Sequence, residues 1–184
     1  APTSRTVNYG ASAAFSVTAT GTSQTYQWKK GSTVLSNGAK YAITSNSSGS
    51  TLTINNCANA DEDTQYTCTV TSLGTSVTSA NATLVVTDPI ITGVSIAQVV
   101  NPTETFTVEV FASGTPALTY QWYGPSGLIS GATNSQYAKA AVEADQGNYY
   151  CVVTSGDTAT SSNISVTVND PPTITGQPTN QTTD

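Results

Sequence analysis

The densest group of residues able to do chemistry is acidic. Asp61, Glu62 and Asp63 are consecutive, and carboxylate oxygens are ligands that calcium prefers. Calcium sites, however, need more oxygen ligands at set spacing than three neighbouring carboxylates supply. We therefore expect a solvated turn here. Asp88 and Asp170 each precede a proline, and we expect them to form turns at domain junctions rather than metal sites.

The sequence lacks the imidazole side chain on which many catalytic sites depend. The sequence contains no His, which excludes nucleophile systems that depend on an imidazole base, and imidazole metal sites with them. No glycine-rich phosphate-binding loop is present either. We therefore predict that residues 1–184 have no enzymatic activity, bind no metal and carry no cofactor.

The charge balance excludes nucleic acid as an expected partner. The chain has 11 Asp and Glu against 5 Lys and Arg, a formal net charge of -6. Phosphate binding needs clustered cations, but the basic residues are scattered: Arg5, Lys29, Lys30, Lys40 and Lys139. No apolar run approaches the roughly 18 residues that span a bilayer, so we expect no membrane insertion.

The elements that must position these residues are short strands. Apolar and polar residues alternate in 15–19, 51–54 and 106–110, and a period of two predicts strands with one buried face. Turn-forming clusters such as Ser36-Asn37-Gly38 separate them. No stretch has a convincing helical period, so the predicted fold class is all-β.

The sequence repeats itself, which indicates two domains. Tyr26-Gln27-Trp28 returns as Tyr120-Gln121-Trp122, and the segment around Cys68 returns around Cys151. Each copy closes with a Val-rich strand and an Asp-Pro pair. We predict a first domain at residues 1–88 and a second at residues 89–169.

The last residues suggest a third repeat. Residues 178–182 resemble residues 2–6, and a Pro-Pro-Thr-Ile-Thr-Gly segment precedes Gln177 but has no counterpart before Ala1. We expect residues 170–184 to be a linker and the first strand of a truncated third repeat, and the chain to be part of a longer tandem array. Chance similarity in a Thr-rich sequence is the competing interpretation.

The chain resembles the immunoglobulin superfamily in its intermediate (I-set) form. The second domain carries the clearest motif, since Trp122 is followed by Asp145-Gln146-Gly147-Asn148-Tyr149-Tyr150-Cys151. The resemblance implies that the Tyr149 side chain packs inward while its hydroxyl binds the preceding turn, where Gly147 permits a tight backbone. The first domain departs from this motif, with Glu62 where the family has Asp and Thr64 where it has Gly, so we expect a differently shaped turn.

The disulfide usual in this family is missing. Its B-strand half is replaced by Val17 and Val108, which leaves Cys68 and Cys151 without that partner. Cys57 lies where the family keeps an apolar residue, and we take Ala140 as its counterpart in the second domain. We expect Cys57 to be a small buried core residue, with a Cys57–Cys68 bond as the alternative.

We expect a set of core residues to be buried between the two sheets of each domain. They are Val17, Trp28, Cys57, Tyr66, Cys68, Val108, Trp122, Asp145, Gly147, Tyr149 and Cys151. The two tryptophans are therefore not expected to stack on sugars. Candidate ligand contacts lie in loops, a common binding surface, and are Thr22, Ser23, Gln24, Leu73, Thr75, Thr115 and Asp157.

Domains that need no disulfide also need no oxidising compartment to fold. Repeats of this kind resemble those of bacteriophage virion proteins and bacterial surface proteins. The first hypothesis is a virion structural or decoration protein at the virion surface, whose partners are other virion subunits and, weakly, cell-surface glycans. The second is an extracellular bacterial adhesin, filament or stalk with spacer domains. An accessory part of a carbohydrate-active enzyme would need a catalytic domain elsewhere in a longer chain.

Overall fold

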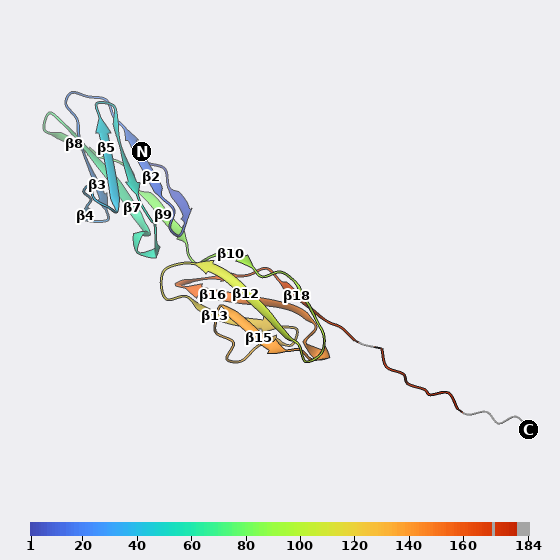
Figure 1. Ribbon diagram of the computed structural model, residues 1–184. Coiled ribbons are helices and arrows are strands. Elements are labelled where there is room, and N and C mark those ends of the chain that lie inside the picture. The colour runs from blue at the N-terminus through green and yellow to red at the C-terminus, as the bar shows by residue number, and fades with distance from the viewer. Residues whose placement is uncertain (171, 180–184) are drawn as a thin grey trace, which may run out of the picture.

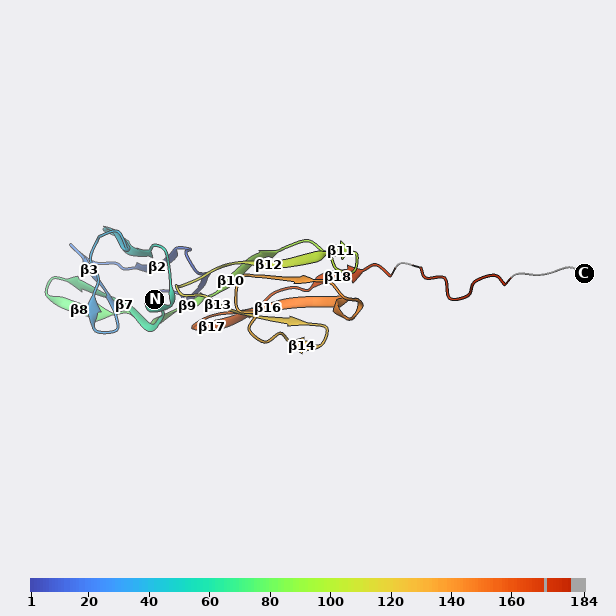
Figure 2. The same ribbon diagram turned by 60° about the horizontal axis from the view of Figure 1, so that its bottom comes forward.

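Two β-sandwiches lie end to end in the computed structural model, which describes residues 1–170 and 172–179. Figure 1 shows the chain passing once from the first sandwich to the second, and the turned view in Figure 2 shows the same arrangement. The described residues contain strands and two single-turn 3-10 helices, η1 (Asn59–Asp61) and η2 (Glu143–Asp145). The all-β prediction is confirmed.

The first sandwich packs a larger sheet on a three-stranded one. The larger sheet has the order β1 (Arg5–Asn8), β9 (Ala82–Thr87), β7 (Asp63–Ser72), β3 (Thr25–Lys30), β4 (Thr33–Val34), and β8 (Thr75–Thr78) also pairs with β7. β1 and β9 are parallel, and the other pairs are antiparallel. The smaller sheet has the order β2 (Ala13–Thr18), β6 (Gly49–Ile54), β5 (Tyr41–Asn46).

The second sandwich repeats the larger sheet and changes the smaller one. Its larger sheet has the order β11 (Gln98–Val100), β18 (Ile164–Val168), β16 (Gly147–Ser155), β13 (Thr119–Gly124), β14 (Gly127–Leu128), with β17 (Asp157–Thr160) paired to β16. Its smaller sheet has the order β10 (Ile90–Val94), β12 (Thr105–Ser113), β15 (Gln136–Ala140). In the second sandwich β10 flanks β12 on its outer side, whereas β2 is the outer strand of its sheet among the described residues.

Each sandwich has its own apolar core, because inward residues alternate with outward polar ones along the strands. In β2 the alternation places Ala13, Phe15 and Val17 inside. The predicted core residues are all buried except Gly147, which is half-buried. The cores form two separate clusters, one from residues 13–86 and the other from residues 100–168.

Two of the predicted correspondences between the domains need correction. Val17 lies four residues before Gly21, and Val110 lies four residues before Gly114. The counterpart of Val17 is therefore Val110 and not Val108. A shift of two residues keeps a side chain on the same face of a strand, and for that reason both valines are buried.

The counterpart of Cys57 is Ala141 rather than Ala140. Cys57 and Ala141 each lie immediately before the N-cap residue of a 3-10 helix, Ala58 and Val142, and both are buried, whereas Ala140 is exposed. The first domain has one additional residue before this point, and Asn56 there adopts a left-handed backbone with φ of 47°. This extra residue caused the misalignment.

Residues 172–179 form no strand and are exposed. The predicted first strand of a third repeat extends beyond them, and residues 171 and 180–184 lie outside the described residues. That strand therefore stays a prediction. In Figures 1 and 2 the described part of this segment runs away from the second sandwich.

Candidate functional site

The two tryptophans are structural and make no surface for a sugar. Each is fully buried and lies opposite a cysteine, Trp28 with Cys68 and Trp122 with Cys151. Their indole nitrogens donate hydrogen bonds inside the fold, at 2.9 Å to Ser50 Oγ and at 2.9 Å to the Asn134 carbonyl. Both polar ends of the rings are thereby satisfied within the protein.

All three cysteines are buried and free. Burial raises the pKa of the Cys57 and Cys151 thiols, and it raises the pKa of Cys68 to about 11. The thiolate is the reactive form of cysteine, so these groups are inert core side chains. The alternative Cys57–Cys68 bond is absent from the structure.

We expect Ellman's reagent to count three thiols per chain in denaturant and almost none within minutes in native buffer at pH 8, because the native thiols are both covered and protonated. Time-resolved absorbance with and without guanidinium chloride measures both numbers. A denatured count below three would mean that Cys57 is bonded. Rapid native labelling would mean that the cores open far more often than closed packing allows.

The acidic turn of the first domain is a structural device, and the expectation of a solvated turn is wrong for Asp61. Asp61 is buried; its Oδ2 accepts the Ala58 N–H at 2.9 Å and pairs with Lys40. The Tyr66 hydroxyl donates to the Asp61 carbonyl at 2.6 Å. The described part of the chain contains no cluster of three or more His, Cys, Asp or Glu side chains placed to hold a metal ion.

Asp145 makes the same contacts in the second domain. It accepts the Val142 N–H at 2.9 Å, pairs with Lys139 at 2.6 Å and receives the Tyr149 hydroxyl on its carbonyl at 2.9 Å. Asp61, rather than Glu62, is therefore the counterpart of Asp145. One extra residue before Tyr66, where the β7–β9 register is irregular, hid this match in the sequence.

The predicted contact loops divide into two groups. At the free end of the first sandwich, Thr22, Ser23, Leu73 and Thr75 are exposed and Gln24 is half-buried. The loops of the second sandwich lie instead against the first. Asp157 is exposed beside this junction, and Thr115 is half-buried and bonded within it.

The junction is centred on Asp88, which is almost fully buried. Its carboxylate accepts the Thr115 backbone N–H at 3.0 and 3.1 Å and the Thr115 hydroxyl at 2.5 Å. Gly114 is required beside it, because a Cβ there would overlap the Asp88 carboxylate and Leu118. Asp88 thus ties the linker to the second sandwich through charge-assisted hydrogen bonds.

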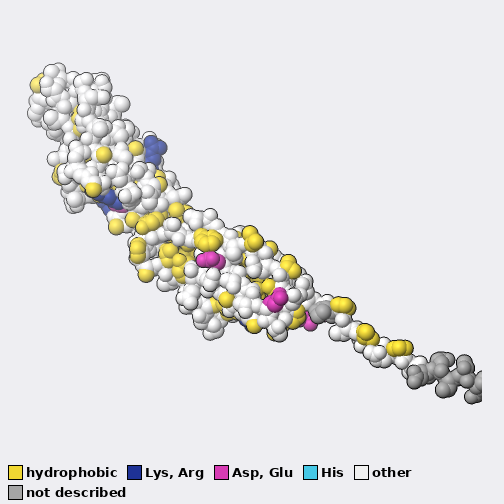
Figure 3. All heavy atoms as spheres, viewed as in Figure 1, with side chains coloured by type: hydrophobic (Ala, Val, Ile, Leu, Met, Phe, Trp, Pro, Cys, Tyr) yellow, Lys and Arg dark blue, Asp and Glu magenta, His cyan; other side chains and the backbone are white. Residues whose placement is uncertain are grey.

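A second set of contacts joins the sandwiches directly. Asn59 Nδ2, from η1 of the first, donates to the Ser155 carbonyl of the second at 3.0 Å. Ser155 Oγ in turn donates to the Thr115 carbonyl at 2.6 Å. In Figure 3 hydrophobic side chains gather where the two sandwiches meet, while charged side chains are few on that face. Sequence reasoning missed Asn59 and the role of Asp88; the repeated Asp-Pro pair was the only signal.

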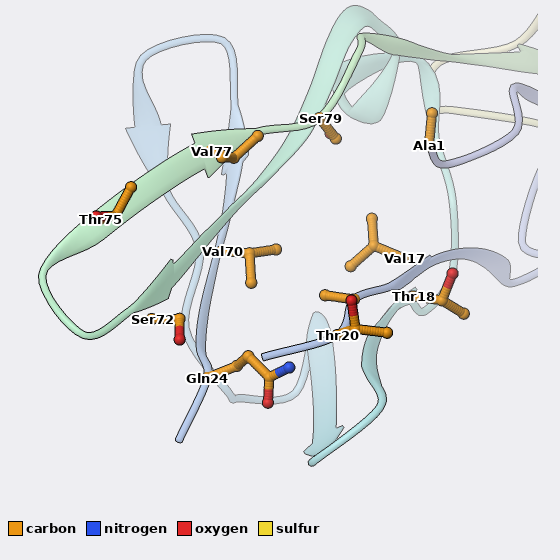
Figure 4. Close-up of a pocket in the computed structure, with 11 residues that line it drawn as sticks. Ala1, Val17, Thr18, Thr20, Gln24, Val70, Ser72, Thr75, Val77 and Ser79 are labelled. Atoms are coloured by element: carbon orange, nitrogen blue, oxygen red, sulfur yellow. The ribbon is translucent and has the colours of Figure 1, made fainter. Parts of the chain in front are cut away.

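An apolar groove of about 340 Å³ opens on the first sandwich, close to Ala1. Figure 4 shows Val17, Val70 and Val77 around it, with Thr18 and Thr20 from the end of β2 and the segment that follows. Gln24 also lines the groove, and its Nε2 is buried without a hydrogen-bond partner in the described structure. The groove has no charged side chain among its lining residues. It is therefore suited to an apolar group that also offers a hydrogen-bond acceptor to Gln24 Nε2.

Comparison with known proteins matches both halves of the chain. The immunoglobulin I-set domain model matches residues 1–86, and an immunoglobulin domain model matches residues 88–169. No curated protein sequence matches.

Solved structures with a similar fold are tandem domains. An I-band fragment from titin is 22% identical with a TM-score of 0.50, covering 91% of this chain and 63% of that one. A three-Ig structure of titin domains with E-to-A changes is 23% identical with a TM-score of 0.50, covering 96% and 66%. The N-terminal two-Ig module of the Drosophila receptor protein tyrosine phosphatase DLAR is 23% identical with a TM-score of 0.43, covering 92% and 96%. The chain thus spans less than two thirds of the titin fragments.

Proposed function

Because the chain belongs to the immunoglobulin domain family, as two domains in tandem, we propose that it is a non-enzymatic structural module that holds other parts of an assembly at a fixed spacing. Immunoglobulin domains are typical of extracellular or surface proteins, and their known roles are mostly in binding and architecture. Within the described residues no helix has the length and apolar character needed to cross a membrane.

This proposal rests on the hydrogen-bonded junction between the two sandwiches. Interdomain contacts in a chain are often small, so relative motion is the default expectation. Here the linker carboxylate of Asp88 is buried and bonded to Thr115, and Asn59 reaches across to Ser155. A spacer needs such a junction, because its length is only useful if its domains do not fold back on each other.

The narrower proposal is a bacteriophage virion protein, displayed at the particle surface and in contact with other virion subunits. The free, buried thiols support it, because virion proteins fold in a reducing cytoplasm where disulfides are rare. Antibodies against the chain would then label intact phage particles. Labelling confined to bacterial envelope fractions would instead support the alternative, an extracellular adhesin or stalk.

Weak adhesion to cell-surface glycans is a further part of the proposal. It rests on the exposed residues Thr22, Ser23 and Leu73 at the free end of the first sandwich, and many copies would strengthen weak contacts by avidity. Chain coupled to beads would bind a glycan array, and replacing these three residues by Ala would abolish that binding. Equal binding by the variant would remove these loops from the proposal.

Replacing Asp88 by Ala tests the spacer proposal. The change leaves the Thr115 N–H and hydroxyl without their acceptor, at a cost of about 1–3 kcal/mol for the buried donors, so the junction should open. Small-angle X-ray scattering should show one extended arrangement for the native chain and a broad mixture for the variant. Asp170→Ala is the matched control, since Asp170 is also followed by proline but is exposed. A native chain that already scatters as a flexible pair would overturn the proposal.

A further inference from the structure

The smaller sheet of the second sandwich ends in a strand that is paired on one side only. Its order is β10-β12-β15, and Figure 1 shows β15 at the border of the sheet, next to β12. In the first sandwich the corresponding strand, β6, is paired on both sides, because β5 covers the side away from β2. The difference arises within the chain: residues 129–135 connect β14 to β15, whereas the longer segment 35–48 connects β4 to β6 and contains β5.

Alternate residues of β15 direct their backbone groups toward this open side. The Ser135 carbonyl, just before the strand, accepts the Val110 N–H of β12 at 3.0 Å. Successive residues of an antiparallel strand face alternate sides, so Tyr137 and Lys139 also face β12. The residues that face away are Gln136, Ala138 and Ala140. The described residues supply no hydrogen-bond partner to the backbone of these three on the open side, and such groups can pair with another strand.

The matching edge of the first sandwich is closed by its own turn. On the side of β5 away from β6, the Ile43 N–H donates to Asn37 Oδ1 at 2.5 Å. The Tyr41 carbonyl accepts the Gly38 N–H at 2.9 Å. The groups that another strand would use are therefore satisfied there. Beside β15, by contrast, a hollow of about 260 Å³ lies between the strand and residues 130–134.

The side chains of β15 suit pairing of the strand with its own copy. A two-fold axis at Ala138 would place this residue opposite itself. Gln136 would then face Ala140 of the second copy, so the outer face of the contact carries only small or uncharged side chains. On the inner face, Tyr137 would lie opposite Lys139. A tyrosine ring attracts a lysine ammonium, and no like charges meet across the axis.

Lysine on an edge strand commonly prevents such pairing, but Lys139 is already neutralised. Its amine pairs with Asp145 at 2.6 Å in the same molecule. Tyr137, moreover, is only half-buried, whereas Leu52, which holds the same position on β6, is fully buried. Ile43 of β5 lies opposite Leu52. A strand on the open side of β15 would cover Tyr137 in the same way.

We propose that β15 of one copy of this chain pairs antiparallel with β15 of a second copy about a two-fold axis at Ala138, which joins the two smaller sheets into one. Backbone hydrogen bonds of the outward-facing residues provide the affinity, as in other cases of strand addition. Because the strand meets itself, the contact closes on two copies. The first sandwiches take no part in it. The inference goes beyond the spacer function, since it adds a lateral contact between modules.

Sedimentation equilibrium of the native chain, up to about millimolar concentration where even weak contacts form, tests the proposal. The average mass should rise from 18.9 kDa to twice that mass and no further. Ala138→Lys should lower the dimerisation constant at least about tenfold, because it sets like charges directly opposite each other. Ala42→Lys is the matched control, since Ala42 is also an exposed alanine on the border strand of a smaller sheet, but at the closed edge. A native chain that stays monomeric, longer assemblies, or a dimer that survives Ala138→Lys would each overturn the proposal.

Cysteine cross-linking tests the register of the pair. Residues directly opposite each other in a hydrogen-bonded antiparallel pair have Cα atoms about 5.5 Å apart, within the range of a disulfide. The natural thiols are buried. Under mild oxidation Ala138→Cys should therefore form a linked dimer at least about tenfold faster than Ala42→Cys. Both positions are exposed, so both variants should keep the native circular dichroism. Equal rates of cross-linking would place the contact elsewhere and contradict the proposed pairing.

Discussion

Trp122→Ala is expected to unfold the second sandwich and leave the first one folded. Trp122 is fully buried, and truncating such a side chain costs about 3–5 kcal/mol. That is a large part of the stability of a domain this small. The two apolar cores share no residue, so the loss should stay in the domain that bears it.

Fluorescence during urea unfolding measures this outcome, since the chain has 2 tryptophans and each lies in one domain. In Trp122→Ala the remaining Trp28 should keep a blue-shifted emission and a native midpoint, while circular dichroism shows the loss of about half the sheet. Trp28→Ala should give the mirror result. Trp122→Phe is the milder control, as it keeps an aromatic ring and loses the hydrogen bond to Asn134. Simultaneous loss of both domains in either alanine variant would show one shared core.

Asp145→Ala is expected to destabilise the second domain by about 2–3 kcal/mol, because it leaves the buried Val142 N–H without an acceptor and removes the partner of Lys139. Asp61→Ala should have a similar effect on the first domain. Chemical denaturation, followed by the tryptophan of each domain, measures both changes.

Two controls separate the contributions to this effect. Lys139→Met removes only the ion pair, whose lysine is 42% exposed, and should cost less than about 1 kcal/mol. Asp157→Ala removes an exposed carboxylate at the surface and should change little. If Lys139→Met cost as much as Asp145→Ala, the helix-capping hydrogen bond would not be the main contribution.

The sequence was sufficient to predict the two immunoglobulin-like sandwiches, and this prediction is confirmed. Alternation identified the strands, and the Trp, Tyr and Cys positions of each repeat marked their cores, because these large side chains fix the spacing between two packed sheets. The origin in a phage or a bacterium, the domain boundaries and the ligand loops remain predictions.

The errors came from single-residue insertions and from contacts between distant residues. The extra residue before Tyr66 moved Asp61 out of its expected position, and Asn56 did the same for Cys57. The junction could not be predicted, because Asp88 and Thr115 are 27 residues apart and only the folded chain brings them together.

Pulling single molecules by their two ends would show whether the chain forms two separate sandwiches, each closed by packing alone. We expect two unfolding events, each releasing roughly 25 nm for a domain of about 80 residues, with lengths unchanged by a reducing agent. A single event that releases both halves together, or lengths that grow when disulfides are reduced, would contradict it.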